Sequence, residues 1–377
     1  MVKPKNDLKF LKIRSDNDKT QMILDIFFKI KESSEFTVKG VSESTGIDNA
    51  FVAGYFNACV NKKLLQTAGN SIYGENLKFS AQTKKVMGIG FREDNCFITV
   101  IDIAGNIVSK ENIKIEVLLS GKGKRKDISM IVKEISAKTM LNSGDLLAVA
   151  VAMPEEMIDI NPKSSEILVN GIKDVFKCPV YATKSATASG YGNREFSIET
   201  KGKDVLYMHS DIGIGVVFKK EMIFEADEYS EEKNGAYLRP WNQFSIVNAT
   251  KELILRGVGT EVVEMVKGDV ERITLNTVLE AAEKKDELAE DLVKRSGLAL
   301  GVRVAYLINM FNAKFVLFGG GTEKAEGRFI PHVMDSMNRF ISKDVLNELR
   351  IVPGVLGESA SSIGAALLCR REIFMEV

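Results

Sequence analysis

The sequence predicts an α/β protein that begins with a small helical domain and continues into two larger lobes. Apolar residues at helical spacing dominate residues 1–80, which predicts the helical domain. A strand, a glycine-containing turn and a second strand then occur twice, at 86–108 and at 204–218. Strand and helix patterns follow each of them, which predicts two related α/β lobes. A chain of 377 residues is long enough for two or three domains.

The bulk composition is that of an ordinary globular protein, with 45% hydrophobic and 27% charged residues. Because the net charge is zero, DNA affinity would need a local basic patch. The apolar runs are short and no apolar signal core opens the chain, so we predict no membrane span and a cytoplasmic location. The cysteines are widely separated, which predicts buried, reduced thiols at Cys59, Cys96, Cys178 and Cys369.

The N-terminal domain, placed at residues 1–82, shows three helix patterns and a strand pair. The stretch 21–30 has an apolar face, residues 37–46 form a short helix that Gly46 ends, and Asp48 caps the third helix. The third helix has apolar residues spaced for one buried side: Phe51, Val52, Tyr55, Phe56 and Cys59. Two short strands with a polar tip follow. This order is typical of a winged helix-turn-helix.

The two lobes are placed at residues 83–203 and 204–377. In the first lobe, strands are predicted at 86–91, 96–108, 146–153 and 179–183, with a helix at 127–141. In the second lobe, strands are predicted at 204–218 and 315–318, helices between 247 and 311, and a last helix at 361–374 that packs back on the first lobe. Two similar lobes that face a cleft form the architecture of the actin-like ATPases.

Four short motifs, in order along the chain, resemble those of the ROK family (repressors, open reading frames and kinases). Gly88–Asn95 lies where the family has G-I-D-I-G-G-T-K, and Ala150–Pro154 where it has G-I-G-V-P-G. Asp211–Val217 resembles G-I-G-A-G-I-V, and Phe318–Gly321 resembles L-G-G-G. The resemblance to ROK transcriptional regulators covers nearly the whole chain. It implies a winged helix-turn-helix followed by a two-lobed actin-like ATPase (ROK) domain.

The residues that the resemblance assigns to catalysis are replaced. ROK sugar kinases carry an Asn that holds a sugar hydroxyl and an Asp that acts as general base, where this chain has Lys184 and Ser185. Phosphate loops need glycine because their backbone N–H groups approach the anion closely. The first loop has Arg92 and Glu93 in place of glycines, and Gly90 in place of the acid that positions magnesium. We therefore predict no catalytic residue and no kinase activity.

Several glycines of the phosphate loops remain: Gly213, Gly215, Gly319, Gly320 and Gly321. They either form tight turns between strands or retain a residual nucleotide loop. The resemblance also implies a zinc site, but residues 225–241 contain neither Cys nor His, so we predict no metal and no cofactor. The five acids of that stretch form a solvated loop or bind a cation: Glu225, Asp227, Glu228, Glu231 and Glu232.

The expected cleft supplies the candidate effector-binding residues: Thr183, Lys184, Ser185, His209 and Asp211. The effector implied by the resemblance is a sugar or a sugar derivative. Lys184 in place of Asn favours an anionic or phosphorylated ligand. His209 lies in a predicted buried strand, where it is either a packed residue or a ligand contact.

The candidate DNA contacts lie on and around the third helix. Its polar and small residues would read bases, and flanking lysines would contact phosphates: Asn49, Ala50, Ala53, Asn57, Lys39, Lys62 and Lys63. No Lys or Arg lies between Gly40 and Asn61, and residues 1–80 carry a net charge of only +3. The predicted shape of this domain favours DNA binding. Its low positive charge indicates that such binding would be weak or unusual.

Three functions are compatible with these patterns. The leading hypothesis is a regulator, expected to be a repressor with activation left open, that binds operator DNA as a homodimer or homotetramer and responds to a small effector. An interaction protein that is blind to ligands is the second hypothesis. A sugar kinase with relocated catalytic groups is the third.

Overall fold

The computed structural model describes residues 19–27, 36–67, 76–80, 84–92, 95–115, 125–154, 158, 162–209, 214–219, 222–225 and 245–377. Contacts divide the chain into two compact units. The first comprises Met1–Gly192 together with Ser359–Val377, and the second comprises Asn193–Glu358. Each unit contains a five-stranded sheet with helices, which confirms the predicted mixed α/β class.

The sheet of the first unit has the strand order β5-β4-β3-β6-β7. Its strands are β3 (Lys85–Arg92), β4 (Asn95–Ile101), β5 (Ile107–Lys114), β6 (Leu146–Met153) and β7 (Val180–Lys184). Strand β4 is antiparallel to its neighbours β3 and β5, whereas β3, β6 and β7 run parallel to one another. The central strands β3 and β6 are apolar almost throughout because layers cover both faces of the sheet. The strands predicted here are confirmed.

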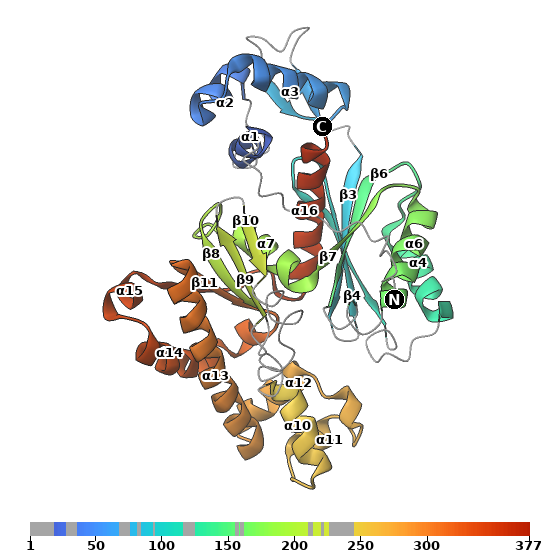
Figure 1. Cartoon of the computed structure of the whole chain (residues 1–377). Helices are drawn as coiled ribbons and strands as arrows, with labels where there is room; N and C mark the ends of the chain where they lie inside the picture. Colours follow the sequence, from blue (N-terminus) through green and yellow to red (C-terminus); the bar gives the residue numbers. More distant parts are fainter. Residues whose placement is uncertain are drawn as a thin grey trace, which may run out of the picture. The chain divides into compact units, whose positions relative to one another are not determined.

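Helices cover both faces of this sheet (Figure 1). Helices α4 (Arg125–Thr139) and α6 (Pro162–Phe176) pack together on one face. Helix α16 (Ala360–Met375) crosses β3, β4 and β6 on the other face and contacts α7 (Ser185–Phe196). The predicted helix 127–141 is confirmed with both ends two residues earlier.

Helix α16 lies closer to the sheet than a helix can approach when side chains intervene. A Cβ atom at Gly88 would lie 2.0 Å from the carbonyl oxygen of Ser362, and one at Gly90 would lie 2.1 Å from Ser361 Oγ. A Cβ atom at Gly364 would lie 1.7 Å from the carbonyl oxygen of Ala188 on α7. These glycines are therefore required for the helix to fit.

The N-terminal helical segment (residues 19–80) consists of three helices and a strand pair. Its elements are α1 (Lys19–Phe27), α2 (Val38–Thr45), α3 (Asn49–Asn61), β1 (Leu65–Thr67) and β2 (Leu77–Phe79). Gly46 ends α2 with a φ of 73°, and Asp48 Oδ1 accepts a hydrogen bond of 2.8 Å from the N–H of Ala50, so both predicted helix boundaries are confirmed. Residues 28–30 of the predicted first helix and the tip of the strand pair lie outside the described residues.

The buried side predicted for α3 is partly wrong. Val52, Phe56 and Cys59 are buried and Tyr55 is half-buried, as the spacing predicts. Phe51 is instead 39% exposed, because the helix turns it away from the core toward solvent, where Lys19 Nζ lies 5.2 Å from its ring centre. The apolar spacing on this short helix is too broad to identify which residue falls at its edge.

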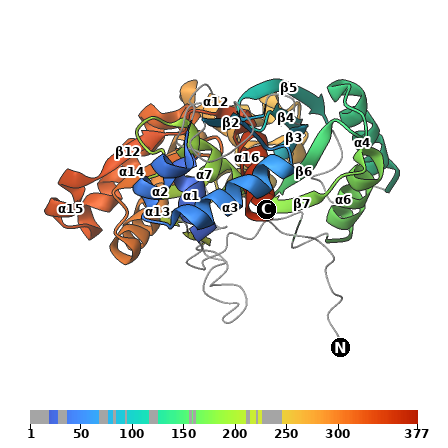
Figure 2. The same ribbon diagram turned by 90° about the horizontal axis from the view of Figure 1, so that it is seen from above.

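The core of the N-terminal helical segment is completed by the end of the chain. Phe374 of α16 is fully buried, and its ring meets that of Phe79 edge-on at 6.2 Å. Tyr55 Oη donates a hydrogen bond of 3.0 Å to the carbonyl oxygen of Phe374, and Lys62 Nζ donates one of 2.7 Å to that of Glu376. Figures 1 and 2 both show the C-terminal end of α16 beside α3. This segment is thus held by residues about 300 positions away in sequence.

The sheet of the second unit has the order β10-β9-β8-β11-β12. Its strands are β8 (Val205–His209), β9 (Ile214–Lys219), β10 (Met222–Glu225), β11 (Phe315–Gly319) and β12 (Arg350–Pro353). The helical block predicted from 247 to 311 comprises α10 (Ile246–Leu255), α11 (Glu261–Met265), α12 (Leu275–Glu283) and α13 (Glu287–Phe311). Helices α14 (Glu326–Phe340) and α15 (Lys343–Glu348) follow. Helix α13 packs closely on α14, since a Cβ atom at Gly301 would lie 2.3 Å from the carbonyl oxygen of Val333.

None of the helices in the described part of the chain is long and apolar enough to cross a membrane. All four cysteines are free and buried, which confirms the predicted reduced thiols. Burial raises the pKa of Cys59 to about 12 and that of Cys178 to about 11. The thiols are therefore protonated and unreactive in the folded protein near neutral pH.

The first prediction compares two glycine substitutions. Gly90→Ala places a methyl group against Ser361 and Ser362, so we expect it to lower the free energy of unfolding by about 3 kcal/mol or to prevent folding. The matched control is Gly54→Ala in α3, where an added Cβ meets nothing within 4 Å. Since alanine favours a helix more than glycine does, we expect Gly54→Ala to raise stability by about 0.5–1 kcal/mol. Thermal unfolding followed by circular dichroism measures both, and equal effects would contradict the packing of α16.

The second prediction concerns pH. The unfolded thiols ionise near their ordinary pKa of 9.0, whereas the folded pKa of Cys59 is about 12. Because the folded pKa is raised, this contribution to stability is complete below the unfolded pKa and is lost as pH rises toward the folded one. We expect the free energy of unfolding to fall across this alkaline window, and less so in a Cys59→Ala variant. A wild-type stability that stays flat there would contradict the buried, protonated thiols.

Candidate functional site

The predicted effector residues of the first unit lie at the carboxyl ends of two parallel strands. Thr183 and Lys184 end β7, where they pair with Ala152 and Met153 of β6. Ser185 is the first residue of α7. Thr183 and Ser185 are buried and Lys184 is half-buried. In open α/β sheets, ligands bind beyond the carboxyl ends of the strands, so the fold places these residues at a position suited to a ligand.

Ser185 has an unusual environment. Its side-chain oxygen is buried, and it is the one such side-chain polar atom among the described residues that lacks a hydrogen-bond partner. An unpaired buried hydroxyl costs about 1–3 kcal/mol, so it is rarely retained without a reason. In the position of the general base, a serine has no titration near neutral pH and cannot supply the same chemistry.

The space of the first phosphate loop is used for packing. Gly90 stands where the resemblance expects an acid that positions magnesium, and α16 fills the volume in front of it. The oxygen of Ser361 and the backbone nitrogen of Ser362 lie 2.1 Å and 2.8 Å from a Cβ atom placed there. A carboxylate cannot occupy this position without displacing the helix.

His209, the effector candidate of the second unit, lies at the end of β8 against a tyrosine. Its Nδ1 atom is 3.2 Å from Tyr207 Oη, and the two rings are 5.9 Å apart. Gly319 pairs with His209 in the sheet, and a Cβ atom at Gly319 would lie 2.4 Å from Tyr207 Oη. The contacts make His209 part of a packed, hydrogen-bonded cluster. The other candidates of this loop, Asp211 and Gly213, lie outside the described residues.

The glycine loop that follows β11 is closed by its own chain. Gly320 and Gly321 have φ values of 73° and 110°, which glycine adopts without strain. The N–H of Gly321 donates a hydrogen bond of 2.7 Å to Glu323 Oε2, and Thr322 Oγ1 donates one of 3.0 Å to the carbonyl oxygen of Gly319. A carboxylate thus occupies a donor that a nucleotide phosphate would use, and its charge repels phosphate. Gly215 lies within β9.

No group of three or more His, Cys, Asp or Glu side chains is placed to hold a metal ion in the part of the chain that the structure describes. Of the five predicted loop acids, Glu225 ends β10. Asp227, Glu228, Glu231 and Glu232 lie outside the described residues, so the choice between a solvated loop and a cation site stays a prediction.

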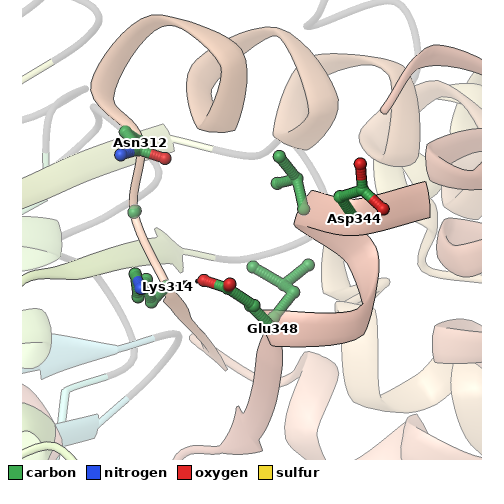
Figure 3. Close-up of a pocket in the computed structure, with 7 residues that line it drawn as sticks. Asn312, Lys314, Asp344 and Glu348 are labelled. Carbon is green, nitrogen blue, oxygen red and sulfur yellow. Dashed lines mark hydrogen bonds and ion pairs between the residues drawn. The ribbon is translucent and has the colours of Figure 1, made fainter. Parts of the chain in front are cut away.

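A small surface pocket of about 120 Å³ lies between the end of α13 and α15 (Figure 3). Asn312, Lys314, Asp344 and Glu348 line it, and Lys314 Nζ lies 2.8 Å from Glu348 Oε2. Both charged side chains are largely exposed. The pocket is below the size of roughly 300 Å³ at which ligand sites begin, and an ion pair occupies two of its charged groups.

The outer face of α3 is exposed and uncharged. Asn49, Ala50, Gly54 and Asn57 are exposed, whereas Ala53 is fully buried in the core of the N-terminal helical segment. The prediction that Ala53 contacts DNA is therefore wrong, because it lies at the border of the outer face, where the core covers it. The sequence did not single out Gly54, which lies on the outer face with open space around it. A glycine at an exposed helix position, where alanine is more stable, is the signal that identifies it.

The lysines beside this face differ in their surroundings. Lys39 forms an exposed ion pair of 3.7 Å with Glu43, which contributes little to stability. Lys62 is bonded to the backbone of Glu376 at the end of the chain. Lys63 follows the helix with a φ of 61°. The structure thus brings Lys62 and Lys63 to the C-terminal end of α3 and Lys39 to α2.

Solved structures of two kinds share this fold. A ROK family transcriptional regulator, described as a homolog of the E. coli Mlc protein, has a TM-score of 0.65 at 14% identity and covers 94% of this chain and 96% of its own. A ROK family glucokinase from Streptomyces griseus, in complex with glucose and AMPPNP, has a TM-score of 0.58 at 18% identity and covers 76% of this chain and 99% of its own. The fold is thus the mixed α/β fold of the actin-like ROK proteins.

Sequence comparison finds the same similarity. Residues 253–372 match the ROK family model. The xylose repressor of Caldicellulosiruptor bescii is 18% identical over 70% of this chain and 72% of its own. The dual regulator NagC of Escherichia coli is 31% identical over 26% of this chain and 24% of its own, and the repressor Mlc is 21% identical over 50% of each. Residues 253–372 are therefore similar to the ROK family, which confirms the resemblance predicted from the motifs.

The third prediction tests the closed glycine loop. Because Glu323 holds the N–H of Gly321 and repels phosphate, we expect millimolar Mg-ATP to leave the melting temperature of the protein unchanged. A Glu323→Gln variant keeps a hydrogen-bond acceptor but removes the charge, and serves as the comparison. Differential scanning fluorimetry measures both. A clear, ATP-dependent rise in the wild-type melting temperature would contradict the closed loop and reopen the question of nucleotide binding.

Proposed function

We propose that this protein is a cytoplasmic transcriptional regulator that binds operator DNA and responds to a sugar or sugar derivative. In this proposal residues 1–82 form a winged helix-turn-helix, and residues 83–203 and 204–377 form the two lobes of the ROK domain. The protein acts as a homodimer or homotetramer, because two-fold symmetric operators are bound by paired helices. Repression is the mode that the names of the xylose repressor and of Mlc support.

The observation that carries the proposal is the open outer face of α3. Asn49, Ala50, Gly54 and Asn57 are exposed while the opposite side of the helix packs into a core. Asn pairs with adenine through two hydrogen bonds, and small residues allow a close approach to the groove. Helix α2 and the turn at Gly46 precede α3 in the order of a helix-turn-helix.

The proposal excludes kinase activity on three separate grounds. A serine with no base chemistry stands at the position of the general base, a helix fills the space of the acid at Gly90, and Glu323 closes the glycine loop. Each loss alone would impair phosphoryl transfer, which depends on positioning and electrostatic stabilisation. The sugar kinase is therefore the least supported of the three hypotheses.

Effector control follows from the packing of α16 in this proposal. The effector binds at Thr183, Lys184 and Ser185, where β7 meets α7, and α16 contacts α7 at Ala188. The same helix supplies Phe374 to the core under α3. A ligand changes DNA binding only when it favours one arrangement of these elements over another. Helix α16 is the element through which such a preference reaches the N-terminal helical segment.

An interaction protein remains the second candidate, and the charge of α3 favours it. The helix carries no Lys or Arg, and the carboxylate of Asp48 caps its N-terminus, where a DNA phosphate would otherwise bind. Phe51, 39% exposed on the same helix, is a side chain suited to a protein surface.

The fourth prediction separates these two functions. Fluorescence anisotropy of the full chain is measured on DNA fragments from around its own gene, over a salt series. Under the regulator hypothesis we expect selective binding that weakens with salt, because phosphate contacts release counterions. Asn57→Ala should lower affinity for the selected fragment about tenfold, since a base contact contributes about 1–3 kcal/mol. Gly54→Arg should raise affinity for all fragments and steepen the salt dependence.

Asn347→Ala, at an exposed position of α15, is the matched control and should leave binding unchanged. Wild-type protein that shows no preference among fragments down to low salt would overturn the regulator hypothesis. That result, together with normal folding by circular dichroism, would support the interaction-protein hypothesis, in which α3 is a protein-contact surface.

A further inference from the structure

We infer that the effector is an anion, and that its phosphate group binds at the N-terminus of α7 against Lys184 and Ser185. The inference rests on the proposed function and names the chemical class of the ligand. Its starting point is the helix itself: α7 spans twelve residues, from Ser185 to Phe196, and has no acidic residue in its first turn. Helix N-termini attract anions because their backbone N–H groups and dipole carry partial positive charge.

The unpaired hydroxyl of Ser185 is the second, independent observation. Ser185 is 4% exposed, and its Oγ has no hydrogen-bond partner among the described residues. Because side chains on a helix tilt toward its N-terminus, the first residue of α7 directs its hydroxyl to the end where the N–H groups are open. A phosphate oxygen is an acceptor that would satisfy this donor, whereas the present surroundings supply none.

Positive charge gathers around the same end of the helix. Lys184, half-buried, directly precedes α7. Arg92 ends β3 at the same carboxyl edge of the sheet, with β6 between β3 and β7.

A lysine ammonium, a hydroxyl and helix N–H groups together are a donor set that matches a phosphate group. A neutral sugar hydroxyl would leave the positive end of the helix dipole without a counter-charge.

Isothermal titration calorimetry on the full chain tests the inference. The probes are glucose 6-phosphate, N-acetylglucosamine 6-phosphate, their unphosphorylated parents, and inorganic phosphate alone. We expect at least one sugar phosphate to bind at least tenfold more tightly than its parent, since a charge-assisted pair contributes about that factor. Weak binding of inorganic phosphate at the same residues would show the shared oxyanion chemistry, and the difference from the sugar phosphate gives the contribution of the sugar.

Three variants locate the phosphate. Lys184→Asn, which replaces the charge by an amide of similar polarity, should lower affinity for the sugar phosphate about tenfold and leave the affinity for its parent unchanged. Ser185→Ala removes the unpaired hydroxyl, so it should lower affinity for the phosphate while the melting temperature of the ligand-free protein stays the same or rises. Lys173→Met, an exposed residue near the end of α6, is the control for loss of one positive charge and should change neither.

Two results would overturn the inference. One is a parent sugar that binds as tightly as its phosphate, and the other is a sugar phosphate whose affinity Lys184→Asn leaves unchanged. Absence of binding for every phosphorylated probe at millimolar concentration would also overturn the inference. DNA anisotropy without effector, measured on the same protein, keeps this outcome apart from failure of the proposed function. Selective DNA binding together with a neutral effector would retain the regulator and reject only the anionic ligand.

Discussion

The close passage of α16 across the first sheet is the constraint on which the rest of the first unit depends. The helix meets β3 with no side chains between the backbones, since Gly88 and Gly90 leave room only for Ser361, Ser362 and their neighbours. Packing at this distance gains many dispersion contacts and tolerates no added methyl group. One buried hydrogen bond, 2.8 Å between Thr99 Oγ1 and Ser362 Oγ, fixes the register of the helix on the sheet.

The same helix holds three parts of the unit together. Its first half fits against β3 and α7, and its last turns enter the core of the N-terminal helical segment through Phe374. Between them, Arg370 Nε donates a hydrogen bond of 2.7 Å to the carbonyl oxygen of Ile103, and its guanidinium lies over the ring of Phe79. Loss of order in α16 would therefore affect the sheet and the N-terminal helical segment at once.

This packing also explains why the catalytic positions are occupied by other groups. A kinase needs an acid and open glycine loops at sites where this chain has a helix in van der Waals contact and a carboxylate bonded to a loop N–H. Gly90 thus serves the fold by allowing the close approach of α16, and the retained Gly320 adopts a positive φ. At the start of α7, a buried hydroxyl without a partner follows Lys184 directly in the sequence, a feature that the packing of the fold does not use.

The sequence by itself determined the strands, most helices and the helix ends at Gly46 and Asp48, because periodicity and capping act within a few residues. The sequence also determined that no general base stands at position 185, because this conclusion needs only the residue type, serine. Tertiary structure alone decided that Phe51 faces solvent and Ala53 the core, that Gly90 is filled by α16, and that Phe374 completes a core some 300 residues away. These depend on contacts between distant segments, whose energies no local pattern encodes.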